Sequence, residues 1–159
     1  MIRTGLGYDS HRFVPRKPLV LGGVRVEYDK GLDAHSDGDV VLHALTDAIL
    51  GAVAAGDIGE HFPDTDSRWA DADSSVFLQH ARELAAGKGY RVGNCDITIL
   101  AEAPKLGPHK PTMSARIAEM LDVPAHAVSV KAKTGEGMGS IGSGEGIVCL
   151  VSVLMVKEE

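Results

Sequence analysis

The chain has few aromatic residues, few cysteines and no excess of positive charge. Aromatic side chains make up only 4% of its 159 residues, so we expect a core of aliphatic side chains. The formal net charge of −6 argues against sequence-independent binding to nucleic acid, which needs a basic surface to neutralise phosphates. Cys95 and Cys149 lie in strand-like runs without metal-binding spacing, so we expect buried free thiols in a reducing compartment.

Long hydrophobic segments are also lacking. Residues 1–5 do not open the apolar stretch of a signal peptide, and the longest apolar run, near the C-terminus, is interrupted by Ser152 and is too short to span a bilayer. We therefore expect a cytoplasmic protein with neither a membrane nor a nucleic acid as its partner. The length is that of a single domain, which we place over residues 1–159.

The hydrophobic pattern predicts strands and helices in alternation. We expect strands over 2–10, 92–101, 128–132 and 147–156, a hairpin over 18–28, and helices over 37–54, 75–86 and 111–121. Ser36 and Asp37 are the candidate caps of the first helix. These elements predict an α+β fold, an α/β sandwich in which helices cover one face of a mixed four-stranded sheet. The other face, rich in Val and Ile, favours association with further copies of the chain.

Asp9 and His11 stand two residues apart on the first predicted strand, so their side chains point to the same face. With His43 on the first helix, they offer three zinc ligands and leave one coordination position open, as in catalytic zinc sites. Asp39 and Asp47 lie four residues before and after His43, where either could accept its second N–H. From these residues alone, a histidine without metal and carboxylates that only solvate the helix remain the alternative.

Two loops carry further candidates. The predicted loop 57–73 holds six acidic residues and is long for a compact domain, which is typical of a functional lid but also of a solvated acidic loop. Residues 133–146 contain six glycines, whose backbone N–H groups could surround a phosphate. There Thr134 could donate a hydrogen bond and Glu136 could hold a hard divalent cation. A flexible hairpin is the other interpretation of this loop.

Eight segments, in this order and spacing, resemble the 2-C-methyl-D-erythritol 2,4-cyclodiphosphate synthase family of the non-mevalonate isoprenoid pathway, in its single-function form. The resemblance runs from the first predicted strand to the last. The segments are Gly7-x-Asp9-x-His11, Ala34-His35-Ser36-Asp37-Gly38-Asp39, His43-Ala44-Leu45-Thr46-Asp47-Ala48, Gly56-Asp57-Ile58-Gly59, Phe62-Pro63-Asp64-Thr65-Asp66, Ala103-Pro104-Lys105, Lys131-Ala132 and Gly144-Glu145-Gly146.

The resemblance implies a homotrimer with sheets around a three-fold axis and active sites at the subunit interfaces. It implies that zinc is bound by Asp9, His11 and His43, and Mg²⁺ or Mn²⁺ by Glu136. Catalytic roles fall to His35, Asp64 and Thr134. The implied substrate-binding residues are Asp9, His11, His35, Ser36, Asp57, Ile58, Gly59, Phe62, Asp64, Asp66, Ala101, Pro104, Lys105, Leu106, Ala132, Lys133, Thr134 and Glu136. Of these, the resemblance assigns to the cytidine and α-phosphate pocket of the adjoining subunit Ala101, Pro104, Lys105, Leu106, Ala132, Lys133 and Thr134.

The implied substrate is a cytidine diphosphate ester with a second phosphate, which attacks the β-phosphorus, closes a ring and releases CMP. A phosphate monoester is nucleophilic at neutral pH, so no protein base is needed. One alternative is a zinc-dependent phosphohydrolase of nucleotide diphosphates, and another is a non-catalytic trimer that binds cytidine nucleotides. Ser140 and Ser143 depart from the family pattern, in which an aromatic residue and an arginine are common. We therefore expect an axial cavity that binds isoprenoid diphosphates weakly.

Overall fold

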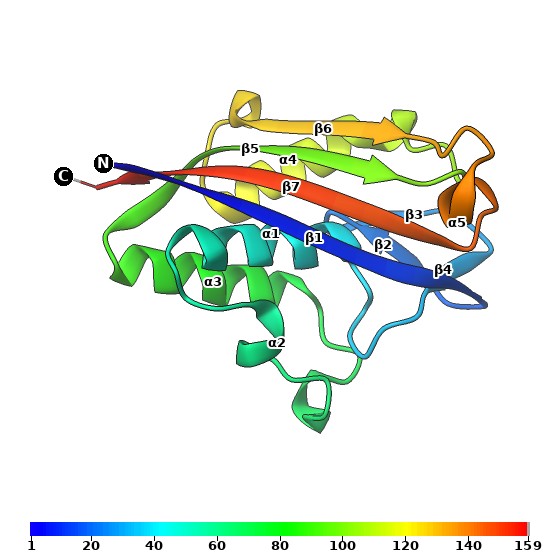
Figure 1. Ribbon diagram of the computed structural model, residues 1–159, viewed down its shortest axis with the longest axis horizontal. Coiled ribbons are helices and arrows are strands. Elements are labelled where there is room, and N and C mark those ends of the chain that lie inside the picture. Colours follow the sequence, from blue (N-terminus) through cyan, green and yellow to red (C-terminus); the bar gives the residue numbers. More distant parts are fainter. Residues whose placement is uncertain (159) are drawn as a thin grey trace.

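The computed structural model describes residues 1–158, which form one mixed sheet packed against helices (Figure 1). Five strands pair in the order β4-β1-β7-β5-β6, and all neighbours are antiparallel except β5 and β6. Their bounds are β1 Ile2–Pro15, β4 Lys30–Leu32, β5 Tyr90–Leu100, β6 Val128–Lys133 and β7 Gly146–Lys157. The strands β2 Leu19–Leu21 and β3 Val24–Val26 form a separate hairpin, as predicted.

The predicted count of four strands was one too low. β1 continues to Pro15, beyond the predicted end at residue 10, and its last residues pair with the short strand β4. Three residues with one glycine give no hydrophobic alternation, so β4 carried no signal of its own. The mixed α+β architecture itself is confirmed.

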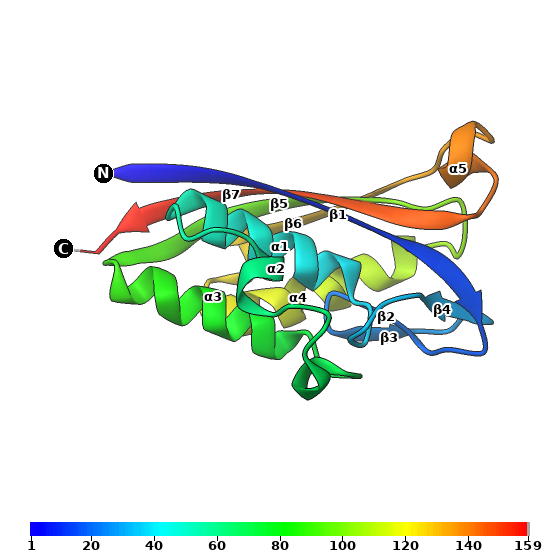
Figure 2. The ribbon, with the colours of Figure 1, turned by 60° about the horizontal axis from the view of Figure 1, so that its bottom comes forward.

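The three long helices, α1 Val40–Ala52, α3 Ser75–Gly87 and α4 Lys110–Leu121, lie on one face of the sheet, which Figure 2 shows from the side. The short helices are α2 Ile58–His61 and α5 Gly139–Gly142, and there are three 3₁₀ turns, η1 Ser67–Trp69, η2 Gly107–His109 and η3 Ala125–Ala127. In Figure 2, α5 stands at one end of the sheet, on the side away from the long helices. The predicted loop 57–73 thus contains α2 and η1. No helix within residues 1–158 is both long and apolar enough to cross a membrane.

The first helix begins later than predicted because neither proposed residue caps it. Asp39 is the N-cap, and its carboxylate accepts hydrogen bonds from the backbone N–H groups of Val41 and Leu42. The same carboxylate accepts from Gly22 and Gly23 in the β2–β3 turn. Asp39 is fully buried, so it joins the hairpin to the helix.

On the opposite face of the sheet, the only helix within residues 1–158 is the short α5 at one end (Figure 2). Large apolar side chains are exposed on it: Ile2, Leu6 and Tyr8 from β1, and Leu150 from β7. Alternate residues of β7, from Ile147 to Met155, face the helices and are buried, as a sheet with one covered face requires. On β1, the residues that face the helices include the buried Gly7 and Phe13 and the half-buried Asp9 and His11.

Both cysteines are buried in the sheet, which confirms the prediction of free thiols. Burial raises the pKa of Cys95 to about 12 and raises that of Cys149 further. Since the thiolate is the reactive form, we expect neither thiol to react with a disulfide reagent at pH 8 in the native protein and both to react after unfolding. A spectrophotometric thiol titration with and without denaturant checks this, and rapid native labelling would contradict the burial.

Candidate metal and substrate site

Two glycines on β1 set the distance between this strand and α1. A Cβ atom on Gly7 would lie 1.8 Å from the carbonyl oxygen of Ala44, and one on Gly5 would lie 1.9 Å from that of Ala48. Only glycine permits so close an approach of strand and helix. The packing brings His43, the neighbour of Ala44 on α1, beside the side chains that β1 presents next.

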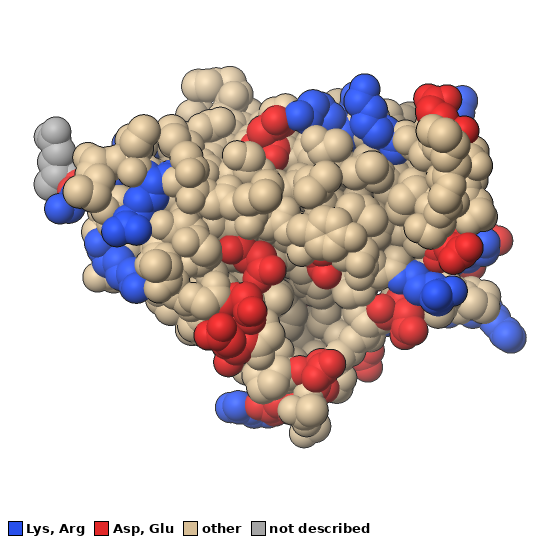
Figure 3. Space-filling model, viewed as in Figure 1, with Lys and Arg blue, Asp and Glu red and all other residues tan. Residues whose placement is uncertain are grey.

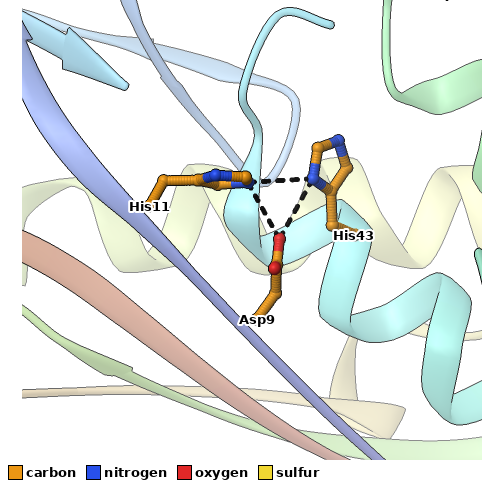
Figure 4. A group of neighbouring side chains, drawn as sticks. All are labelled: Asp9, His11 and His43. Carbon is orange, nitrogen blue, oxygen red and sulfur yellow. Dashed lines mark hydrogen bonds and ion pairs between the residues drawn. The ribbon is translucent and has the colours of Figure 1, made fainter. Parts of the chain in front are cut away.

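Asp9, His11 and His43 converge at this point (Figure 4). Asp9 Oδ2 lies 2.9 Å from His11 Nε2 and 3.1 Å from His43 Nδ1. The two imidazole nitrogens are 3.1 Å apart. The structure therefore assembles the three residues that the sequence predicts as metal ligands.

The donor set and its spacing fit a divalent cation. Tetrahedral ligands about 2.0 to 2.1 Å from zinc are separated by about 3.3 Å, close to the observed triangle. Burial opposes ionisation of Asp9, but hydrogen bonds and charge from His11 and His43 outweigh it and lower its pKa to about 2. Asp9 is thus an anion at neutral pH, and all three side chains remain partly exposed on the side open to solvent.

The triad lies in a hollow of about 520 Å³ between β1, α1 and the 57–73 segment. Figure 3 shows this recess with acidic side chains along its border. Nine of the predicted site residues line it: Asp9, His11, His35, Ser36, His43, Ile58, Gly59, Phe62 and Asp64. Residues from four separate segments therefore meet where the sequence predicts one site.

A second hollow, of about 260 Å³, lies at the ends of β5 and β6. It contains all the residues that the resemblance assigns to cytidine: Ala101, Pro104, Lys105, Leu106, Ala132, Lys133 and Thr134. Within residues 1–158, no residue lines both hollows. At its edge, Glu102 accepts a hydrogen bond of 2.8 Å from the N–H of Gly135 and so anchors the start of the glycine-rich loop.

Three predicted residues line neither hollow. Asp57 caps α2 by accepting from the N–H of Glu60, at 2.9 Å. Asp66 pairs with Arg68, whose guanidinium lowers the pKa of this carboxyl. Glu136 is exposed, with its backbone at φ +52°. Their roles toward a ligand stay predictions.

The predicted partners of the second nitrogen of His43 were wrong. Asp39 caps α1, and Asp47 accepts from the N–H of Ile58 at 2.7 Å, which ties α1 to α2. Two hydroxyls take their place: Ser36 Oγ at 3.0 Å and Ser74 Oγ at 2.8 Å from His43 Nε2. Asp39 and Asp47 have the helical spacing that suits a bond to His43. Each carboxylate instead accepts hydrogen bonds from backbone N–H groups.

The sequence also missed Ser74 and the aromatic wall of the hollow. Phe77 and Trp69 line the hollow beside Phe62, with ring centroids 4.5 Å (Phe77) and 5.0 Å (Trp69) from that of Phe62. In the sequence, Phe77 has the spacing of a core residue of its helix, and Ser74 that of a helix cap. Only the tertiary fold places them at the site.

Comparison with known proteins identifies the relatives of this chain. Residues 2–156 match the YgbB family. A protein of Xanthomonas axonopodis pv. citri, named 2-C-methyl-D-erythritol 2,4-cyclodiphosphate synthase, is 57% identical over 153 residues, which cover 96% of this chain and 92% of that protein.

Solved structures that superpose on this chain belong to proteins with related names. The bifunctional IspDF of Campylobacter jejuni superposes with a TM-score of 0.96 at 44% identity, covering 100% of this chain, which spans only 43% of that protein. A Plasmodium falciparum IspF in complex with CDP superposes with a TM-score of 0.88 at 36% identity, covering 99% of this chain and 97% of the other. These matches confirm the resemblance seen in the sequence: the chain belongs to the YgbB family, that of the 2-C-methyl-D-erythritol 2,4-cyclodiphosphate synthases.

Proposed function

We propose that this protein cyclises 4-diphosphocytidyl-2-C-methyl-D-erythritol 2-phosphate to 2-C-methyl-D-erythritol 2,4-cyclodiphosphate and releases CMP. As such it is a phosphorus–oxygen lyase of the non-mevalonate isoprenoid pathway. The observation that carries the proposal is the Asp9–His11–His43 triad at the hollow beneath the 57–73 segment, in a chain of this family. A cytoplasmic location is part of the proposal, supported by the two free thiols.

The triad is proposed to hold zinc, since two imidazoles and one carboxylate suit this ion and leave a position open. Glu136, exposed on the glycine-rich loop, is proposed to bind Mg²⁺ or Mn²⁺ through its carboxylate. When bound, the two cations supply Lewis-acid polarisation of the diphosphate and neutralise its charge. The remaining tasks, binding and alignment, fall to the side chains of the chain itself.

Alignment is proposed to come from two sides of the first hollow. His35 and Ser36 border the triad and offer donors to the diphosphate and to the 2-phosphate. Ile58, Gly59, Phe62 and Asp64 form the facing wall, where Asp64 accepts from the methylerythritol hydroxyls. Asp57 and Asp66 are proposed to contact the substrate from the same segment. Held between these walls, the 2-phosphate approaches the β-phosphorus in line with the departing CMP.

The cytidine site is proposed to come from a neighbouring copy of the chain in a homotrimer. Two observations support this: the two hollows share no lining residue, and the sheet face with Ile2, Leu6, Tyr8 and Leu150 has no covering layer within residues 1–158. In this arrangement Lys105, Lys133 and the Thr134 hydroxyl meet the CMP phosphate, where negative charge grows as the bond breaks.

The test is phosphorus NMR of the reaction with substrate, zinc and magnesium. We expect CMP together with a cyclic diphosphate in equal amounts. Open-chain phosphate products would instead assign a zinc-dependent phosphohydrolase. Tight binding of CDP without turnover would assign a cytidine-nucleotide binding protein.

Zinc binding is expected to depend on pH. Imidazoles bind zinc only when neutral, so protons compete with the ion for the two histidine ligands as the pH falls. Asp9, with its pKa of about 2, stays ionised down to a much lower pH, so its protonation does not determine the pH at which half of the zinc is lost. Zinc should therefore be retained at pH 7 to 8 and lost as the pH falls below about 6. Metal analysis after dialysis across this range checks it, and full retention at pH 4 would exclude the two histidines as ligands.

A further inference from the structure

A hydroxyl and a carboxylate lie behind His43, on the side away from the triad. Ser74 is fully buried, and its Oγ lies 2.8 Å from His43 Nε2. The same hydroxyl donates a short hydrogen bond to Asp37 Oδ1. Although Ser74 occupies the N-cap of α3, its side chain makes no cap bond to that helix. Its hydroxyl is committed to His43 and Asp37 instead.

The direction of these bonds determines the protonation of His43. A serine hydroxyl has one hydrogen, and Ser74 gives it to the carboxylate of Asp37, which can only accept. Toward His43, Ser74 therefore offers a lone pair, so Nε2 must carry the hydrogen. In the neutral ring, Nδ1 then has its lone pair on the side of Asp9 and His11, where a metal ligand needs it. The hydrogen bond that Nδ1 makes to Asp9 Oδ2 without an ion requires a second proton on the ring, and the metal takes the place of that proton.

Asp37 is held in place by bonds of its own. Its carboxylate accepts from the N–H of Ser74 at 3.1 Å and from that of Asp39 at 3.0 Å. Its backbone N–H donates to the carbonyl of Ala72 at 3.0 Å. Asp37 thus ties the segment that leads into α1 to the end of the 57–73 segment, next to Ser74.

Ser36 does not impose the same choice. Its Oγ lies 3.0 Å from His43 Nε2 and accepts weakly from the N–H of Gly38, at 3.3 Å. Its own hydrogen is not committed to an acceptor among the described residues, so it can accept from Nε2–H or donate to a bare nitrogen. Of the two hydroxyls, only that of Ser74 is fixed as an acceptor.

We propose that Ser74 and Asp37 are positioning residues that lock His43 in its Nε2–H tautomer and so prepare Nδ1 to bind the metal. The inference rests on the metal site of the proposed function but not on the reaction. Neither residue needs to touch the substrate: Asp37 acts on Ser74, Ser74 on His43, and His43 on the ion. Ser74 and Asp37 thus preorganise the His43 ligand before the metal binds.

The test measures metal binding without substrate, so it does not depend on the identity of the reaction. For Ser74→Ala we expect zinc affinity about 10- to 100-fold weaker, the usual effect of removing a partner behind a ligating histidine. Ser74→Thr, which keeps the hydroxyl, should restore most of the affinity. Ser114→Ala is the matched control, because it removes a hydroxyl bonded to the carbonyl of Val128 and should leave zinc affinity unchanged.

Two further readouts separate tautomer control from a structural effect. Long-range proton–nitrogen NMR of the zinc-free protein at pH 8 should show His43 as Nε2–H in the wild type and as a mixture of tautomers in Ser74→Ala. In a double-mutant cycle, Asp37→Asn should weaken zinc binding alone but add nothing in the Ser74→Ala background. Wild-type zinc affinity in Ser74→Ala, additive effects, or an Nδ1–H wild type would each overturn the proposal.

Discussion

Replacing His43 by alanine is expected to empty the metal site and to lower kcat/KM about a thousandfold or more. The imidazole supplies one of three converging donors, and its Nδ1 lies 3.1 Å from both Asp9 Oδ2 and His11 Nε2. A catalytic cation contributes several kcal/mol to the transition state, and each 1.36 kcal/mol is a factor of ten in rate. Zinc per chain by elemental analysis and steady-state CMP release are the two measurements.

The control for this variant is His126→Ala. His126 is exposed in η3, on the chain before β6, and lines neither hollow. It should keep wild-type zinc content and activity. An active His43→Ala protein, or one that retains its zinc, would show that His43 is not a metal ligand.

The second large effect is expected from Gly7→Ala, which adds one methyl group at a residue that does not line the hollow. Its Cβ would lie 1.8 Å from the carbonyl oxygen of Ala44, whereas carbon and oxygen atoms in contact are about 3.3 Å apart or more. α1 must move away by about 1.5 Å or β1 must bend. We expect a loss of about 3 kcal/mol or more in the free energy of unfolding. Because His43 moves with α1, zinc affinity should fall as well.

Gly51→Ala provides the matched comparison within α1. A Cβ on Gly51 meets nothing within 4 Å, and the residue is exposed in the helix. Alanine there should stabilise the protein by about 0.5 to 1 kcal/mol, because glycine is a poor helix former. Urea unfolding of both variants measures the two free energies. A Gly7→Ala protein as stable as the wild type would mean that the strand and the helix are not packed as described.

The order of the principal elements could be predicted from the sequence, and so could the ends of α3, α4 and β7 to within one residue, but the start of α1 could not. Ser36, Asp37 and Asp39 are all suitable N-cap residues within four positions. Asp39 is the N-cap, and its carboxylate also accepts hydrogen bonds from Gly22 and Gly23 of the hairpin. Such a contact between distant segments cannot be read from the local sequence. The strand β4 was missed for a related reason, since its only support is its pairing with the end of β1.

The ligand triad could be predicted because Asp9 and His11 share a strand face and His43 on the first helix was the third candidate, and the resemblance implied the same three ligands. The environment of His43 could not be. Asp39 and Asp47 have the right helical spacing, but backbone N–H groups from other segments take both carboxylates. Ser74 lies 31 residues further along the chain, and only the packing of α3 beside α1 brings its hydroxyl to the imidazole.

In the proposed reaction the substrate's own phosphate, and not water, attacks the β-phosphorus at this site. The most direct test is to run the reaction in water enriched in oxygen-18 and to analyse both products by mass spectrometry. If the reaction is a cyclisation, neither CMP nor the cyclic diphosphate gains a heavy oxygen. One heavy oxygen per turnover in either phosphate product would show attack by water and would contradict the cyclisation.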